Sequence, residues 1–226
     1  MDSHRHDIRP SGQTLRQAAY ERIEDLLNTA RLAPGEIVTQ RELMRRTDAT
    51  LAAVRESIPR LEAEGLLKTL PNRGLMVPSV DVRFVREAYR LRSLIETGAL
   101  PDAMRALPRP RIESWIAEHE AGLQTGLSDV EDAVSEQFQH LDWDLHRTLV
   151  HSMNNSLVDN IYRVNTIKIR MAVQSRLQVT PLNIVRVAQE HLAFLRPMLD
   201  GDERAAKKAL QAHIEKSMRL ALGDTP

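Results

Sequence analysis

Helical spacing of apolar residues is the feature of this 226-residue sequence that most limits its fold. From Asp81 to Leu222, apolar residues recur at the three- and four-residue steps of an α-helix, and no alternating strand pattern interrupts them. Segments that favour turns divide this stretch near residues 107–109, 126–128, 154–156, 179–181 and 200–202. The sequence therefore predicts a bundle of about six helices over residues 80–226.

The first eighty residues carry a different pattern, with three short helices followed by two extended segments. Helical spacing covers Thr14–Ala30, Gln40–Thr47 and Leu51–Gly65. The segments LLKTL and LMVPSV follow on either side of PNRG, as in a β-hairpin with a small tip. Three helices and a hairpin form a winged helix-turn-helix, so we expect a mainly α protein with this unit at residues 13–79. Residues 1–12 are polar and are expected to form a flexible tail.

Composition excludes several kinds of site. The chain has no cysteine, which rules out disulfides and thiolate metal sites, so any metal must be bound by His, Asp or Glu. The N-terminus lacks the apolar core of a signal peptide, and no apolar run approaches the ~20 residues of a membrane helix. We therefore expect a cytoplasmic protein without a membrane partner. The 31 basic and 31 acidic residues balance, so bulk charge gives no support for binding nucleic acid.

The placement of individual arginines does support DNA binding. The second helix of a helix-turn-helix lies in the major groove, where its N-terminal residues meet base edges. Here that helix opens with TLAAVRES, which exposes Arg55 toward a guanine or a phosphate. Each arginine alone would be read as a surface charge, but the complete pattern of helices and wing favours DNA contact. We predict contacts from Arg41, Arg45, Thr50, Arg55, Arg73 and Gly74.

The run LAPGEIVTQRELMRRTDATLAAVRESIPRLEAEGLLKTLPNRGLMV resembles the DNA-binding domain of the GntR family. That domain has a Pro-Gly turn, a recognition helix of the form VRE…LEAEGL and a glycine-tipped wing, and the resemblance implies that Arg41, Arg55 and Gly74 contact DNA. Thr50-Leu51 departs from the family's Ser/Thr-Arg, so one arginine contact is missing and the operator is expected to differ. Pro59 also predicts a kink in the recognition helix, beyond its DNA-facing turns.

Four potential metal ligands lie on the inward faces of three predicted helices. Asp142 and His146 are four residues apart and continue the row of the core residue Phe138. His191 and His213 lie within or beside apolar stripes of two later helices. A single such histidine would be read as an ordinary core residue, as His119 and His151 are. Burying all four ligands without partners would be costly, and a divalent cation removes that cost. We expect Zn, with Ni, Fe or Mn as alternatives.

The second half of the chain also carries a resemblance. The runs REAYRLRSLIE, LDWDLHRTLVHSMNNSL and EHLAFLRPMLDGDERAAKKALQAHI resemble the FCD ligand-binding domain of FadR-type GntR regulators. Many of these bind a metal through one aspartate and three histidines, which match the four ligands above, and many sense small organic acids. The resemblance implies that Arg92 and Asn155 bind the effector. A salt bridge from Arg92 to Glu96 is a close alternative, and the first interpretation of Asn155 is a helix-terminating residue.

The sequence thus predicts a DNA-binding transcriptional regulator with a small carboxylate effector. A homodimer on a pseudo-palindromic operator is expected, with effector binding changing how the helix over residues 81–106 docks against the winged helix. Repression relieved by ligand rests on family analogy alone. Two alternatives stay open: a metal-dependent enzyme using the Asp/His site, and a regulator that senses the metal itself. The enzyme alternative lacks any other catalytic motif and gives the winged helix no role.

Overall fold

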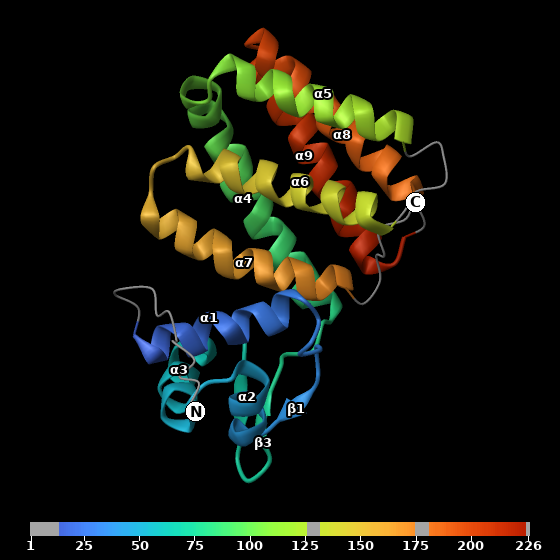
Figure 1. Cartoon of the computed structure of the whole chain (residues 1–226). Coiled ribbons are helices and arrows are strands. Elements are labelled where there is room, and N and C mark those ends of the chain that lie inside the picture. The colour runs from blue at the N-terminus through green and yellow to red at the C-terminus, as the bar shows by residue number, and fades with distance from the viewer. Residues whose placement is uncertain (1–13, 126–131, 175–180, 225–226) are drawn as a thin grey trace, which may run out of the picture. The chain divides into compact units, whose positions relative to one another are not determined.

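The computed structural model describes residues 14–125, 132–174 and 181–224, and it divides into two compact units that join between Val80 and Asp81 (Figure 1). The tail expected at residues 1–12 lies outside the described residues. Within the described ranges there are nine helices and three short strands, which confirms the mainly α fold. None of the helices described there combines the length and apolar character needed to cross a membrane.

The first unit is the expected winged helix-turn-helix. It contains α1 (Leu15–Asn28), α2 (Gln40–Thr47), α3 (Leu51–Ala63) and the strands β1 (Ile37–Val38), β2 (Lys68–Leu70) and β3 (Gly74–Met76). The strands form one antiparallel sheet in the order β1-β3-β2, in which Leu75 pairs with Val38 on one side and Thr69 on the other. The sequence predicted only the hairpin of β2 and β3, because a two-residue strand is too short to show alternation. The core includes Ile23, Leu27, Leu43, Val54, Leu61 and Leu75.

Threonine side chains fix where the first three helices begin. Thr14, Thr39 and Thr50 each precede a helix, and each hydroxyl accepts a hydrogen bond from the backbone N–H three residues later. Such caps satisfy one of the unpaired amides of the first turn and stabilise a helix by about 1 kcal/mol. Thr50 therefore has a structural role at a position predicted to contact DNA. The helix that it caps, α3, extends through Pro59 to Ala63.

Gly74 begins β3 in a conformation that other residues adopt only with strain. Its φ is 109°, and a Cβ atom at this position would lie 2.7 Å from the carbonyl oxygen of Val38 in the neighbouring strand β1. Because Val38 is itself paired with Leu75, the strand cannot move away without disrupting the sheet. Gly74 is thus required by the packing of the wing against β1, whatever its role at DNA.

A side chain at position 74 would collide with strand β1. Gly74→Ala is expected to destabilise the DNA-binding unit by roughly 1–3 kcal/mol, since it adds backbone strain and a clash with a backbone oxygen. Thermal unfolding followed by circular dichroism would measure the loss. Gly35→Ala is the matched control, because Gly35 also has a positive φ of 80° but its nearest atom would be Ser79 Oγ at 3.7 Å. Equal losses in the two variants would contradict the clash.

The second unit is an all-helical bundle. Its described helices are α4 (Val82–Ala106), α5 (Arg109–Thr125), α6 (Asp132–His151), α7 (Ser156–Gln174), α8 (Pro181–Asp200) and α9 (Glu203–Leu222). The long helix α4 packs against α6, α7 and α9, while α8 packs against both α5 and α9. The number of described helices agrees with the expected number, and the expected breaks near residues 107–109, 154–156 and 200–202 fall between helices. Buried side chains of the bundle include Leu100, Trp115, Leu145, Leu149, Phe194 and Leu210.

The helix α4 is the element that directly follows the DNA-binding unit in the chain. It begins at the cap residue Asp81, whose carboxylate accepts a hydrogen bond from the Phe84 N–H at 2.7 Å. Three turns further along, α4 carries Arg92 and Glu96, both buried within the second unit. One continuous helix therefore connects the start of the second unit with its interior.

Candidate metal centre

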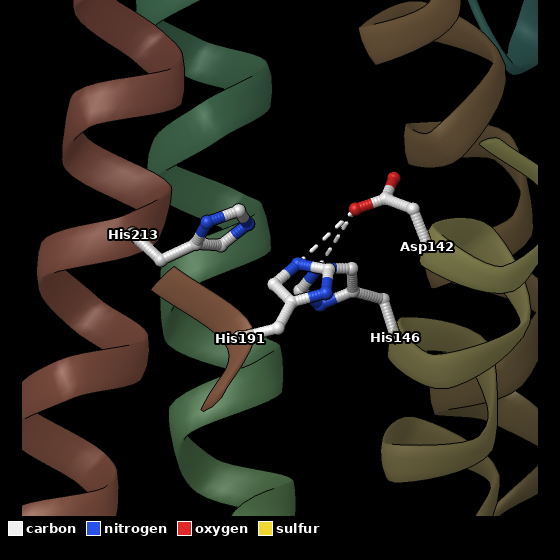
Figure 2. A group of neighbouring side chains, drawn as sticks. All are labelled: Asp142, His146, His191 and His213. Carbon is white, nitrogen blue, oxygen red and sulfur yellow. Dashed lines mark ion pairs between the residues drawn. The ribbon is translucent and has the colours of Figure 1, made fainter. Parts of the chain in front are cut away.

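Three helices bring the four predicted metal ligands together. Asp142 and His146 come from successive turns of α6, His191 comes from α8 and His213 from α9 (Figure 2). One possible ligand atom from each residue lies within 4.8 Å of those from the other three. The histidines are buried and Asp142 is partly exposed. The spacing on α6 places its two ligands on one face, as expected for residues four apart.

Carboxylates outside the group hold the outer nitrogens of two of these imidazoles. His146 Nδ1 lies 2.7 Å from Glu96 Oε2, and His213 Nδ1 lies 2.8 Å from Glu190 Oε2. A carboxylate accepts hydrogen bonds, so Nδ1 donates in both contacts and Nε2 of the neutral ring keeps its lone pair. Metal-binding histidines are commonly oriented in this way, because the outer partner fixes the tautomer and makes the ligand atom more basic.

The inner nitrogens of the three imidazoles have no such partners. Nε2 of His146, His191 and His213 are all buried and lack a hydrogen-bond partner among the described residues. Two of them face Asp142 Oδ1, at 3.2 Å from His191 and 3.6 Å from His146 (dashed lines in Figure 2). Each buried polar atom left unsatisfied costs about 1–3 kcal/mol. A divalent cation would satisfy all three nitrogens and the carboxylate at once, so the residues fit a metal ion.

The electrostatics of the centre agree with this fit. Burial lowers the pKa of His191 well below its ordinary value and that of His213 to about 4, so both rings are neutral at pH 7. Burial opposes charge on His146 too, but Glu96 and Asp142 on its two sides raise its pKa. Burial disfavours the Asp142 carboxylate, yet the neighbouring His146 helps to hold its pKa well below the usual range. The neutral rings of His191 and His213 and the ionised carboxylate of Asp142 are the protonation states that metal ligands require, and His146 would give up any proton on Nε2 when a metal binds.

Glu96 connects the centre to α4. It is fully buried, and its Oε1 accepts hydrogen bonds from Arg92 Nε at 2.7 Å and from the Tyr162 hydroxyl at 2.6 Å, while its Oε2 faces His146. Burial opposes its charge, but Arg92 and His146 lower the pKa of Glu96 to about 2. The sequence indicated Glu96 only as a partner of Arg92, because residue spacing gives no sign of a contact between α4 and α6.

A cavity lies beside the centre and gives a ligand room to bind. Its volume is about 110 Å³. One water needs roughly 10–15 Å³ of such space, so a small molecule fits. Apolar side chains such as Phe138, Trp143 and Ile169 form part of the wall. The polar lining residues are Tyr89, Arg92, Gln139, Asp142, Arg186, His213 and Ser217.

Two arginines contribute to this lining. Arg92 both lines the cavity and forms the salt bridge with Glu96, so the two interpretations of this residue are compatible. Arg186, on α8, was not anticipated from the sequence. Its Nη1 donates to Glu190 Oε2 at 2.8 Å, but its Nε is buried without a partner among the described residues. A buried N–H of this kind beside a cavity is suited to a ligand oxygen.

Two other polar residues lie differently from what the sequence indicated. Asn155 is exposed and is not among the residues that line the cavity. Its side-chain oxygen accepts from the backbone N–H groups of Leu157 and Val158 at the start of α7, so it caps the beginning of this helix instead of terminating the helix before it. His119 was read as an ordinary core residue, and it is buried, but its ring contacts a predicted metal ligand, with Nε2 2.8 Å from His191 Nδ1.

In the first unit, the arginines predicted to contact DNA are exposed: Arg41, Arg45, Arg55 and Arg73. Arg55 Nε donates to Gln40 Oε1 at 2.9 Å, which ties the recognition helix α3 to the first residue of α2. Arg46 has a different role, because its guanidinium binds Glu36 at 2.7 Å and the Arg31 carbonyl oxygen at 2.9 Å. It therefore holds the end of α2 to the segment after α1.

Two family models match the chain. The model for the bacterial regulatory proteins of the gntR family matches residues 15–77, and the FCD domain model matches residues 87–216, which is more than half of the chain. The two matched segments fall within the two units of the structure. Between them they include all of the metal-ligand and DNA-contact candidates.

Known proteins agree with these matches. An uncharacterized HTH-type transcriptional regulator of Streptomyces ambofaciens is 28% identical over 90% of this chain and 84% of its own. The HTH-type transcriptional repressor RspR of Escherichia coli is 24% identical over 82% and 79%. The solved structure of E. coli McbR/YncC shares the fold with a TM-score of 0.73 at 15% identity, over 92% of this chain and 97% of that one. The chain therefore belongs to the GntR family and is a DNA-binding transcriptional regulator with an FCD domain.

Proposed function

We propose that this regulator is a repressor whose affinity for its operator falls when a small organic acid binds beside a divalent metal. Asp142, His146, His191 and His213 would hold the metal, with Zn expected and Ni, Fe or Mn as alternatives. The observation that carries this proposal is the convergence of three buried, unpartnered Nε2 atoms and one carboxylate beside a cavity. The E. coli relative described as a repressor supports the sign of regulation.

The residues around the cavity favour an anionic effector. A bound metal ion would supply a Lewis acid with coordination positions open to a carboxylate oxygen. Arg92 and Arg186 would donate hydrogen bonds to the rest of the ligand, and a guanidinium can bind both oxygens of a carboxylate. Arg186 shares the single carboxylate of Glu190 with Lys216, whose Nζ lies 3.2 Å from Oε1. Glu190 is thus shared by two cations, and the Nε of Arg186 remains without a partner among the described residues and could donate to a ligand oxygen.

The helix α4 offers a route from the cavity to the DNA-binding unit. It carries Arg92, which lines the cavity, and Glu96, which holds His146, and its first residues follow the wing directly in the chain. An effector changes operator affinity only if it binds one arrangement of the protein better than another. We infer that the effector acts on α4 and thereby changes the DNA-bound arrangement of a homodimer on a pseudo-palindromic operator.

Fluorescence anisotropy with the DNA upstream of the protein's own gene would test this proposal. The metal-loaded and chelator-treated proteins would be compared across a salt series, with and without a panel of small carboxylic acids. We expect selective, salt-sensitive binding that at least one acid weakens about 10-fold or more, and only with metal present. An equal response after metal removal would contradict the role of the metal. A response to metal alone, with no acid active, would favour the metal-sensing alternative.

Arg55 is the exposed cation that the recognition helix α3 would present to DNA. Arg55→Ala is expected to weaken operator binding by about 10- to 100-fold and to reduce its salt dependence, because an exposed cation of the recognition helix is lost. The same anisotropy titration measures both effects. Arg109→Ala serves as the control, since Arg109 is an exposed cation on α5 paired with Glu113. Equal affinities for the Arg55 variant and the wild type would remove Arg55 from the DNA interface.

A further inference from the structure

A buried histidine outside the proposed ligand set contacts one member of that set. His119, on α5, is fully buried, and its ring packs edge-on against Phe138 with 5.4 Å between the centroids. Its Nδ1 lies 2.6 Å from the backbone carbonyl oxygen of Trp115, one turn earlier in the same helix. Its Nε2 lies 2.8 Å from Nδ1 of His191 on α8. His119 is therefore placed between a fixed acceptor and a proposed metal ligand.

The contacts of His119 determine where the protons lie. The Trp115 carbonyl oxygen only accepts, so Nδ1 of His119 must donate to it. In a neutral ring the proton on Nδ1 leaves Nε2 as an acceptor, and a charged ring would be costly at a site without exposure. His191 Nδ1 must then donate to His119, which leaves the lone pair of His191 on Nε2. That atom is the one that faces Asp142 Oδ1 at 3.2 Å.

We propose that His119 is a positioning residue for the metal centre: it fixes His191 in the tautomer that presents a bare Nε2 to the metal. This inference rests on the proposed metal function. The other two histidine ligands are held by Glu96 and Glu190, whereas His191 is held by a neutral ring, so its orientation is fixed without another negative charge. In the opposite tautomer, the His191 Nε2–H would point into the centre and occupy the ligand position.

Zn²⁺ alone is the probe for the first test, in a competition titration against a chromophoric chelator with the full-length protein. His119→Phe keeps a ring beside Phe138 but removes the acceptor, so Zn²⁺ affinity is expected to fall about 10- to 100-fold, as for other outer partners of metal-binding histidines. His119→Gln restores an acceptor and is expected to retain affinity within about 3-fold of the wild type. His151→Phe, at an exposed histidine, is the control and is expected to bind as the wild type does.

Nitrogen NMR of the imidazoles in the metal-free wild type tests the proton positions without any variant. We expect the proton of both His119 and His191 on Nδ1. A proton on His191 Nε2, or wild-type Zn²⁺ affinity in a folded His119→Phe variant, would overturn the inference. Failure of the wild type to bind Zn²⁺ would instead count against the metal centre, so the two failures are distinguishable. Circular dichroism checks the fold of each variant. If His119→Phe does not fold, the NMR result for the wild type decides the question.

Discussion

Replacing His146 with alanine is expected to weaken Zn²⁺ binding by at least about 100-fold and to abolish the response of operator binding to the acid. The variant loses one of four proposed ligands, and loss of an outer partner alone typically costs 10- to 100-fold in affinity. It also removes the N–H group that donates a hydrogen bond to Glu96, so the contact between the centre and α4 is lost together with the ligand. Chelator competition measures the first effect, and anisotropy with the metal-loaded protein and an active acid measures the second.

His140→Ala provides the matched control, because His140 is an exposed histidine on the same helix. It should keep both Zn²⁺ affinity and effector response. A His146→Ala protein with full metal content and full response would show that the site has been assigned wrongly. A protein that keeps its metal but loses its response would assign His146 to signalling rather than to ligation.

Glu96 forms a buried ion pair with Arg92, and removing its charge is expected to have a large effect on stability. Glu96→Gln is expected to lower the free energy of unfolding of the second unit by about 3–5 kcal/mol, the range seen when one partner of a buried ion pair is removed. The amide cannot compensate the buried charge of Arg92, and it cannot accept from Arg92, Tyr162 and His146 as well as a carboxylate does. Urea denaturation of the metal-free protein, followed by circular dichroism, measures the loss.

The exposed pair of Arg109 and Glu113 is a close geometric match for this buried pair. Both pairs lie four residues apart on a helix and join Nε to Oε1, at 2.7 Å for Arg92–Glu96 and 2.9 Å for Arg109–Glu113. Glu113→Gln is expected to change stability by less than about 0.5 kcal/mol, because water solvates and screens both of its charges. Comparable losses in the two variants would mean that burial does not set the strength of the Glu96 contacts.

Much of the fold and the proposed ligand set follows from helical periodicity. Asp142 and His146 share a face because they are four residues apart, and His191 lies within an apolar stripe, so their convergence required only that the three stripes meet in one core. The strand β1 was missed because two residues carry no periodicity. Confirmation of the fold class thus came from long, regular segments, where the repeated pattern outweighs any single residue.

The outer partners of the ligands could not be predicted, since they depend on how helices pack. Glu190 precedes His191 in the sequence, yet its carboxylate holds His213 on another helix. His119 follows Trp115 by four residues, which is the ordinary spacing of a core stripe, and its contact with His191 exists only because α5 packs on α8. Arg186 is likewise placed at the cavity by tertiary structure. The spacing of residues in a sequence indicates which side chains share one face of a helix, but it does not indicate which faces of different helices pack together.

The three donors that converge on Glu96 also constrain how this regulator can evolve. No other residue at this position can accept from a guanidinium, a phenol and an imidazole of three different helices as well as this carboxylate does. No single second substitution restores all three, so changes at these positions should be strongly epistatic. We expect a substitution of Glu96 to be tolerated only when several of its partners are replaced as well. Homologues should therefore either keep the whole group or lack most of it.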